Sequence, residues 1–335
     1  MSIAVCVPAR NEAALLPRLL DALAAQRDTL AFKLCLLLDS CTDASEAIVR
    51  SRATLLPFDT IIATTFSEAP NAGLARRKAM EIGLSAVNGE HPLIISTDAD
   101  TVPDPRWLSA NRAALDIADI ATGSIERIGG EACPTQDRLE AYYDALYALR
   151  RAFDPVPWEA AKTHHYTSAA SLAFRADAYR ALGGFAPIGH GEDGHIIDAA
   201  HRAGLRVRHD AAIRVRTSAR RDGRAVGGLA EHLRRLDADG GEPLVAHPED
   251  AAWRYRRYAA ARHAWDNMAA ARLALAVLLA CEVAHIDRVA ADVENAQAFA
   301  TRVVPDVPGG ERQVPLADAE AALARLCVPD QVLAA

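Results

Sequence analysis

The sequence lacks the features of several protein classes. Its six cysteines are scattered, with no CxxC pair and no dense pattern, so we expect reduced thiols in a cytoplasmic protein. The N-terminus MSIAVCVPARNE has no basic stretch and indicates a first strand, not a signal peptide. The longest apolar run, LALAVLLACEVA, contains Glu282 and is shorter than the ~20 residues of a membrane span. We therefore expect no transmembrane segment, and attachment to a membrane surface stays open.

An excess of basic charge is also missing. The 335 residues include 44 Asp and Glu against 37 Lys and Arg, which gives a formal net charge of −7. This balance argues against a nucleic-acid binder that relies on a basic face. Apolar residues make up 51% and charged residues 24%, as in a folded, helix-rich globular protein. The length fits one large α/β domain with an appended part, or two modest domains.

Apolar strands and amphipathic helices alternate over the first hundred residues. We predict strands at 3–8, 33–39, 59–66 and 91–100, with helices between them at 12–26, 44–56 and 72–87. Continuous apolar strands separated by helices indicate a parallel sheet covered on both faces. After Gly228 the pattern changes to successive helices, with 240–250 as a linker. We therefore expect an α/β domain over residues 1–228 and a helical region over 229–335.

Polar residues follow three of the predicted strands, at 10–12, 39–43 and 98–100. In parallel sheets, ligands bind beyond the carboxyl ends of the strands. Asp98 and Asp100 would point the same way if the strand continues past Thr97. Two carboxylates side by side suit Mg²⁺ or Mn²⁺, which takes further ligands from water and substrate phosphates. A turn with capping acids explains this segment alone equally well, and Asp104 is expected to cap a helix that begins near Pro105.

Five segments occur in the order and spacing of one enzyme family: VPARNE, LLLDSCTDAS, NAGLARRKAM, STDADTVPDPRWL and GGFAPIGHGEDGHIIDAAHRAG. From residue 1 to about 220 the chain resembles the family 2 glycosyltransferases. The resemblance implies a GT-A fold, that is a Rossmann-like, mostly parallel sheet with helices on both faces, to which this chain adds a helical C-terminal extension. It also implies a nucleotide-diphospho-sugar donor and a divalent metal, Mn²⁺ or Mg²⁺.

The resemblance also implies residue roles. Asp39 would contact the base of the nucleotide, Asp98 the ribose and the metal, and Asp100 the metal. Asp193 is the first candidate, and Glu192 the second, for the base that deprotonates the acceptor hydroxyl. Such a base is needed because a hydroxyl is a weak nucleophile near neutral pH. A single displacement of this kind inverts the anomeric carbon. The nucleotide-sugar site is expected to comprise Pro8, Ala9, Arg10, Glu12, Asp39, Arg77, Asp98, Ala99 and Arg220.

Arginines enter this set because a guanidinium pairs with phosphate in bidentate fashion. Many relatives place a metal-binding histidine where this chain has RVRTSARR. Arg216, Arg220 and Arg221 could instead close over the diphosphate as a clamp, and a solvated basic loop is the alternative. Of the run RRK at 76–78, we assign one side chain, Arg77, to the nucleotide and expect the others on the surface.

The acceptor side is less defined. His190 is expected to touch the acceptor, and Trp158 could stack on a sugar, although a lone Trp more often packs in a core. The acceptor could be a small metabolite, a glycan or a lipid carrier. The helical region could form an acceptor lid, a homodimer surface or a cover for the sheet.

Two other functions compete with a glycosyltransferase. A nucleotidyltransferase that makes sugar nucleotides normally has a Gly-rich phosphate loop after the first strand, and PARNE contains no Gly. A non-catalytic nucleotide-sugar-binding protein would not need both Asp98 and Asp100, the acids of the DxD motif, and the Glu192-Asp193 pair as well. We therefore expect an enzyme.

Overall fold

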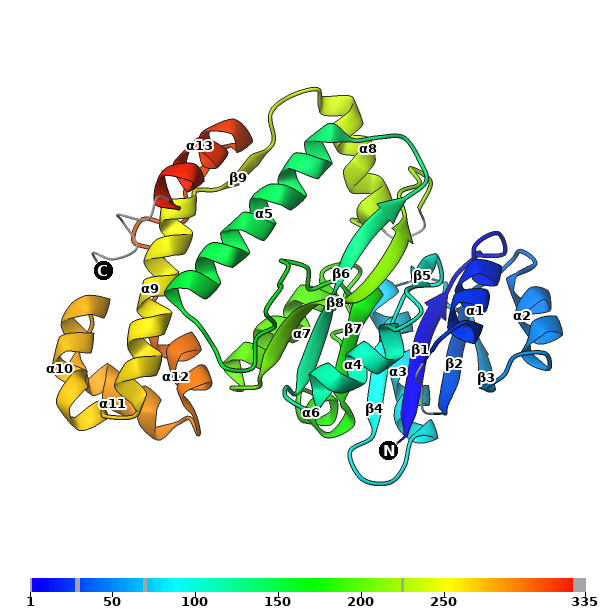
Figure 1. Cartoon of the computed structure of the whole chain (residues 1–335), viewed down its shortest axis with the longest axis horizontal. Coiled ribbons are helices and arrows are strands. Elements are labelled where there is room, and N and C mark those ends of the chain that lie inside the picture. Colours follow the sequence, from blue (N-terminus) through cyan, green and yellow to red (C-terminus); the bar gives the residue numbers. More distant parts are fainter. Residues whose placement is uncertain (1, 28–30, 69–70, 224–225, 328–335) are drawn as a thin grey trace.

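A central sheet forms the scaffold of the protein (Figure 1). The computed structural model describes residues 2–27, 31–68, 71–223 and 226–327. In this part of the chain the sheet has eight strands, in the order β3-β2-β1-β4-β7-β6-β8-β5. They are β1 (Ile3–Ala9), β2 (Phe32–Asp39), β3 (Asp59–Thr65), β4 (Leu93–Ser96), β5 (Thr101–Pro103), β6 (Ile120–Ile128), β7 (Leu172–Arg175) and β8 (Val207–Ser218).

Most strands of the sheet run in one direction. β3, β2, β1 and β4 pair in parallel, as predicted. β7 is antiparallel to both β4 and β6, so β6 and its parallel neighbour β8 again run with β1. The carboxyl ends of β1, β2, β4, β6 and β8 therefore meet at one edge, where ligands are expected.

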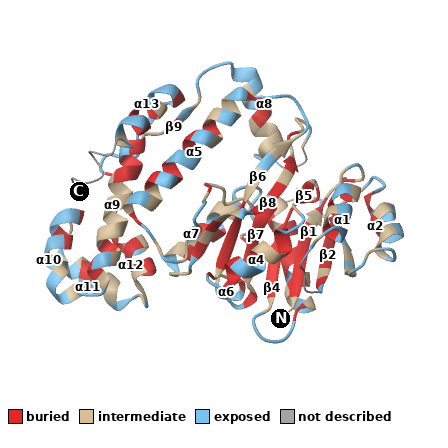
Figure 2. Cartoon of the chain, viewed as in Figure 1, coloured by how far each residue is buried: buried red, intermediate tan, exposed pale blue. Residues whose placement is uncertain are grey.

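Helices cover both faces of the sheet, because successive strand residues point to opposite faces. Ile3, Val5 and Val7 of β1 pack in the core under α1 (Leu16–Ala24), α2 (Ser45–Ala53) and α4 (Trp107–Leu115). Ala4 and Cys6 pack in the core on the other face, under α3 (Ala72–Ala86), α6 (Ala176–Ala181) and α7 (Glu192–Arg202). Figure 2 shows the buried strands between partly exposed helices. The predicted α/β class with helices on both faces is confirmed.

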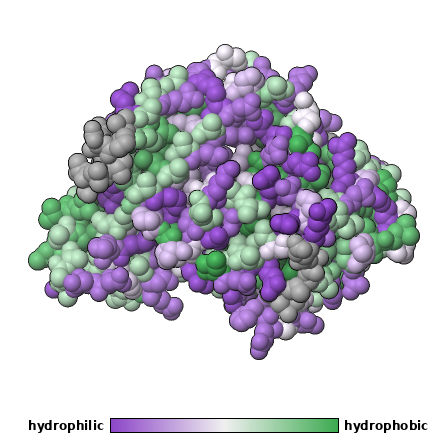
Figure 3. Space-filling view, in the orientation of Figure 1, coloured by the Kyte–Doolittle hydropathy of each residue, from purple (hydrophilic) through white to green (hydrophobic). Residues whose placement is uncertain are grey.

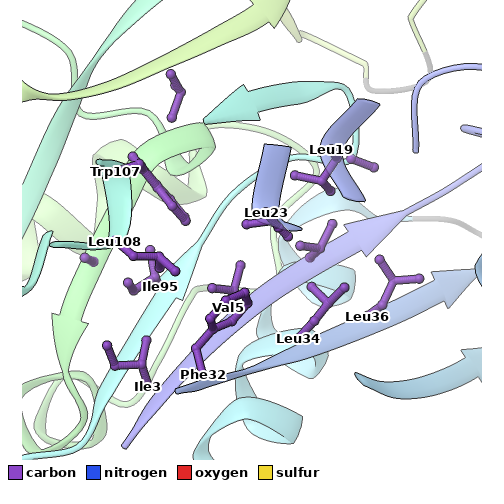
Figure 4. Packing of buried hydrophobic residues seen from close by; sticks show 14 of the residues in the cluster. Ile3, Val5, Leu19, Leu23, Phe32, Leu34, Leu36, Ile95, Trp107 and Leu108 are labelled. Carbon is purple, nitrogen blue, oxygen red and sulfur yellow. The ribbon is translucent and has the colours of Figure 1, made fainter. Parts of the chain in front are cut away.

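Trp107 anchors one face of this core. Its ring is fully buried and packs with Leu108 above the strands that carry Ile3, Val5 and Ile95 (Figure 4). Its Nε1 donates a hydrogen bond to Ser171 Oγ at 3.0 Å. Trp107 is therefore a core residue.

The strand predicted over 91–100 is shorter in the structure. β4 ends at Ser96, and the Thr101 N–H donates to the Asp98 carbonyl at 3.2 Å, which closes a turn. The extended geometry that would align Asp98 with Asp100 is thus absent. The prediction that the Asp104 side chain caps the next helix is wrong. α4 begins at Trp107, and the Asp104 carboxylate lies near Arg214 and Arg216.

The C-terminal region forms a helical layer beside the sheet (Figure 1). Its elements are α8 (Leu229–Asp239), β9 (Leu244–Ala246), α9 (Pro248–Trp265), α10 (Met268–Leu279), α11 (Val283–Ala291), α12 (Ala296–Val303), β10 (Gln313–Pro315) and α13 (Leu316–Leu326). The predicted linker at 240–250 is wrong, because β9 pairs with β10 and α9 begins within it. α5 (Pro134–Phe153) shares a core with α9 and α13 through Tyr142 and Leu146, although it precedes residue 229.

α10 presents an apolar surface. Leu273 and Val277 are 67% and 83% exposed, and hydrophobic side chains gather there at the lower left of Figure 3. Among the described residues no single helix is long and apolar enough to cross a membrane. α10 and α11 meet that test only as a pair bent by 120°.

Candidate functional site

The loops that follow β1 and β2 are tied to each other. Asn11, in the left-handed region at φ 54°, accepts a hydrogen bond through Oδ1 from the Thr42 N–H at 2.7 Å. The next N–H, of Glu12, donates to Ser45 Oγ at 2.8 Å. These bonds hold the buried Glu12 carboxylate at the carboxyl edge of the sheet. Asp39 is buried at the end of β2, where Ser40 Oγ donates to its Oδ1 at 3.2 Å.

Pro8 and Ala9 form the end of β1, and Arg10 follows directly. The Arg10 Nε is buried and has no hydrogen-bond partner among the described residues. A buried donor without a partner is costly, and a ligand oxygen would relieve that cost. The segment predicted to line the nucleotide thus contains one unsatisfied donor.

The turn after β4 carries Asp98 and Asp100 and brings Asp100 near Glu12. Thr97 Oγ1 donates to the Ala170 carbonyl at 2.8 Å and Ala99 is buried, so the turn is fixed on both sides. Burial is the largest cause that raises the pKa of Asp100 to about 7; the charges of Asp98 and Glu12 act in the same direction, against the lowering effect of Arg220. The edge therefore carries more negative charge than its own arginines neutralise.

A buried arginine of α3 links this turn to α7. Arg76 donates to Glu192 at 3.0 Å through Nε, to Ser96 Oγ at 2.9 Å through Nη1 and to Asp98 at 2.9 Å through Nη2. Burial lowers the pKa of Arg76, but Asp98 and Glu192 raise it and the net shift is upward. Arg76 is thus a permanent cation between acids 94 residues apart in sequence (192 minus 98).

Arg77, which the sequence analysis assigned to the nucleotide, lies elsewhere. Its Nε contacts Glu81 at 3.1 Å on the exposed face of α3, and its Nη1 donates to the Phe185 carbonyl. The helical spacing could have separated the two arginines. Arg76 falls on the same stripe as the buried Ala79 and Met80, whereas Arg77 falls with Glu81, four residues on.

A second arginine closes the acid cluster from the end of β8. Arg220 donates to Glu12 through both terminal nitrogens, at 2.8 Å for Nη1, and its Nη2 lies 3.4 Å from Asp100. The other two members of the predicted clamp point away. Arg221 pairs with Asp237 at 2.8 Å, and the Arg216 Nε lies 3.8 Å from Asp104. Of the three predicted clamp residues, only Arg220 contacts Glu12 and Asp100.

The acid pair at the start of α7 divides into two environments. Glu192 is buried and held by Arg76. Asp193 is half-buried, and its carboxylate accepts from the Gly194 N–H at 2.8 Å and from the Ala169 N–H at 3.4 Å. Within the described segments, an arginine contacts Glu192 and none contacts Asp193.

A sequence profile of known proteins identifies the family. The profile described as glycosyl transferase family 2 matches residues 4–181, more than half of the chain. The chain belongs to this family. As a family 2 glycosyltransferase it carries its matched motifs on β1 to β4, on α3 and on the turn at 97–100, within the sheet expected of a GT-A fold.

Several solved structures are similar to this glycosyltransferase at low sequence identity. TarS from S. aureus with UDP-GlcNAc is 18% identical, with 83% of this chain and 72% of TarS covered at a TM-score of 0.49. A mannosyltransferase from Pyrobaculum calidifontis with GDP-Man and Mn²⁺ is 17% identical, with 98% and 87% covered at 0.49. Glucosyl-3-phosphoglycerate synthase from Mycobacterium tuberculosis with UDP is 20% identical, with 71% and 78% covered at 0.42. No curated protein sequence matches the chain.

The acids of this glycosyltransferase fit a divalent cation only in part. Within the described ranges, no set of three or more His, Cys, Asp or Glu side chains could hold a metal. Asp98 and Asp100 are nevertheless hard oxygen donors in one turn, and the raised pKa of Asp100 reflects burial first and then the nearby charges of Asp98 and Glu12, which a cation would offset. Such a pair fits Mg²⁺ or Mn²⁺ that completes its shell with water and diphosphate oxygens.

The two predicted acceptor residues lie apart from each other. His190 is exposed beside the loop after β8, where a Cβ on Gly227 would lie 2.9 Å from its ring. Trp158 donates from Nε1 to the Val207 carbonyl at 3.1 Å, at the start of β8 and at the opposite end of that strand from Arg220. It lines a separate cavity of about 1050 Å³. The structure does not bring Trp158 to the acid cluster.

Proposed function

We propose that the protein transfers a sugar from a nucleotide-diphosphate donor to an acceptor hydroxyl, in a metal-dependent reaction that inverts the anomeric carbon. One observation carries this proposal: Arg76 and Arg220 join the acids of the β1 loop, of the 97–100 turn and of α7 into one network at the carboxyl edge of the sheet. Sheets of this type bind ligands at that edge.

The donor side of the proposal uses the strand-end loops. The nucleotide would lie along Pro8, Ala9 and Arg10, with Asp39 at its base. The unsatisfied Arg10 Nε supports a ligand oxygen at this place. Arg220 is the one predicted clamp residue that reaches the acids, so it is the guanidinium best placed to meet the diphosphate.

Mn²⁺ or Mg²⁺ would be held by Asp98 and Asp100. When bound, such a cation offsets the negative charge that develops on the leaving diphosphate. Arg76 would hold Asp98 in position, because its guanidinium lies 2.9 Å from that carboxylate. The protein's part in donor binding is thus to hold two carboxylates ready in a turn that is itself anchored.

The acceptor side uses the start of α7. Asp193 would take the proton of the acceptor hydroxyl while the hydroxyl oxygen attacks the anomeric carbon and the bond to the diphosphate breaks. Glu192 is a poorer base because Arg76 already binds its carboxylate. We therefore assign Asp193 as the base and rank Glu192, which Arg76 already binds, second. The acceptor class is taken up below, and a cytoplasmic location and a homodimer remain predictions.

The test is turnover of a panel of nucleotide-diphospho-sugars with and without Mn²⁺. We expect metal-dependent release of nucleoside diphosphate that Asp100→Ala and Asp193→Asn each reduce. Asp104→Asn is the matched control, because Asp104 pairs with Arg214 and Arg216 outside the network. Intact turnover in both test variants would refute the assigned roles. Pyrophosphate release from a nucleoside triphosphate and a sugar phosphate would instead favour a nucleotidyltransferase, and binding without any turnover a non-catalytic protein.

A further inference from the structure

A polar cavity of about 730 Å³ lies between β6, the end of β8 and α5. Its size is in the range of sites for small ligands. Residues of β6 form one wall, the acidic face of α5 forms another, and the segment that includes His164 and Tyr166 closes it. None of the five sequence segments that resemble the family lines this cavity.

The cavity borders both halves of the proposed reaction site. Ala219 lines it and directly precedes Arg220, which contacts Glu12 and Asp100 on the donor side. Tyr166 also lines it and lies three residues before Ala169, whose N–H donates to Asp193. The cavity therefore borders the segment that leads to Arg220 on the donor side and the segment that leads to the Asp193 contact.

The lining of the cavity has an excess of negative charge. Five carboxylates and three cations line it: Glu126, Glu131, Asp137, Glu140 and Asp144 against Arg127, Lys162 and Arg214. Ion pairs occupy members of both sets, since Arg127 pairs with Asp137 and with Glu140 at 2.8 Å, Asp144 lies 2.7 Å from His165 Nδ1, and Arg214 lies 3.7 Å from Asp104. Among the lining groups of the described chain, Glu126 and Glu131 remain against Lys162, so negative charge is still in excess. Burial lowers the pKa of His164 to about 4, so this side chain adds no positive charge at neutral pH.

These groups select for hydrogen-bond donors. An ionised carboxylate only accepts hydrogen bonds, so the ligand must supply O–H or N–H groups. A phosphate or a carboxylate on the ligand would face like charge. The half-buried ring of Tyr166 offers an apolar face, as the C–H face of a sugar requires.

We propose that this cavity binds the acceptor and that the acceptor presents an unphosphorylated sugar residue, neutral or amino-substituted. The proposal rests on the proposed function, because it names the substrate class of the same site. Glu126 is the carboxylate best suited to a test. It is exposed and makes no ion pair or hydrogen bond with a described residue, so its replacement should leave the fold intact.

The experiment measures binding by saturation-transfer NMR with four probes: methyl glucoside, methyl glucosaminide, glucose 6-phosphate and glucuronate. We expect the wild-type protein to bind the two methyl glycosides and to bind the two anionic sugars more weakly. Glu126→Lys should weaken methyl glucosaminide at least about threefold and strengthen glucose 6-phosphate by a similar factor, as one exposed charge contact allows. Asp239→Asn is the control, since Asp239 is an exposed acid on α8 outside the cavity.

Stronger binding of glucose 6-phosphate or glucuronate than of the methyl glycosides to the wild-type protein would overturn the inference. So would equal probe binding in wild type, Glu126→Lys and Asp239→Asn. Slow hydrolysis of the donor by water is measured in parallel without any acceptor. If the wild-type protein shows no hydrolysis of the donor, the proposed function is refuted. If it hydrolyses the donor but prefers the anionic sugars to the methyl glycosides, only the acceptor class is refuted.

Discussion

Replacement of Arg76 tests whether the acid network depends on one buried cation. Arg76→Met keeps much of the side-chain length and removes the guanidinium, which leaves Asp98, Glu192 and Ser96 without their partner. Removal of one partner of a buried ion pair costs about 3–5 kcal/mol, because the remaining charge stays buried. Glu192 is 6% exposed and cannot regain water without movement of α7. We therefore expect Arg76→Met to lower the free energy of unfolding by about 3 kcal/mol or more.

Arg76→Lys separates charge from geometry. The ammonium retains the positive charge, but a single nitrogen cannot replace three nitrogens that contact three different side chains. Each lost hydrogen bond to a charged group is worth about 1.5–3 kcal/mol. We expect Arg76→Lys to fall between the wild type and Arg76→Met.

The assay is urea unfolding at pH 7, with Arg77→Met as the matched control. Arg77 pairs with Glu81 on the exposed face of α3, so its loss should change stability by no more than about 0.5 kcal/mol. A double-mutant cycle with Glu192→Gln should show a coupling of about 1 kcal/mol or more, since the two side chains are in contact. Equal stability of Arg76→Met and Arg77→Met would refute the reasoning.

Four further outcomes follow from the site and the core. Asp193→Asn should reduce kcat for transfer by about a hundredfold or more while the Kd of the donor stays unchanged, as steady-state kinetics and calorimetry can show. Arg220→Gln should raise the Kd of a nucleoside diphosphate about tenfold by calorimetry, the value of one charge-assisted hydrogen bond. His164 has a pKa of about 4 in the fold against 6.5 unfolded, so only the unfolded state gains a proton as pH falls from 6.5 to 4. Stability is complete above that window and falls by about 3 kcal/mol across it, and urea midpoints should show a smaller loss in His164→Gln. Gly123→Ala should destabilise by about 1–3 kcal/mol in the same assay, because its Cβ would lie 2.3 Å from Ser171 Oγ.

Local pattern predicted much of the sheet. The run IAVCVP and the five residues LCLLL between Lys33 and Asp39 are continuously apolar, as expected of strands buried on both faces, and they form most of β1 and β2. The position of the site at the strand ends follows from the same parallel order. Glu12 and Asp100 lie there as predicted, and the structure joins them through Arg220.

Contacts between distant segments were beyond the sequence pattern. Arg220 lies 208 residues from Glu12, and no local feature relates the two. The β9–β10 pair joins segments near 245 and 314, so the Gly- and Pro-containing stretch at 240–250 was read as a linker. The conformation of residues 97–100 was also predicted wrongly. They form a turn and not a strand, although Asp98 and Asp100 still lie near each other. Sequence reasoning named both acids for a conformation that they do not adopt.

Arg220 also changes the electrostatic balance of the site relative to a histidine. Glu12, Asp98, Asp100 and Glu192 carry four negative charges when ionised, and Arg76 contacts two of these acids while Arg220 contacts the other two. A neutral histidine in place of Arg220 would add a metal ligand and no charge. The arginine instead adds a positive charge and no ligand, because a guanidinium has donors only. If Asp98 and Asp100 hold a cation as proposed, this exchange removes one protein ligand from its shell and adds a guanidinium that can bind phosphate, so the cation would take more of its ligands from the donor diphosphate.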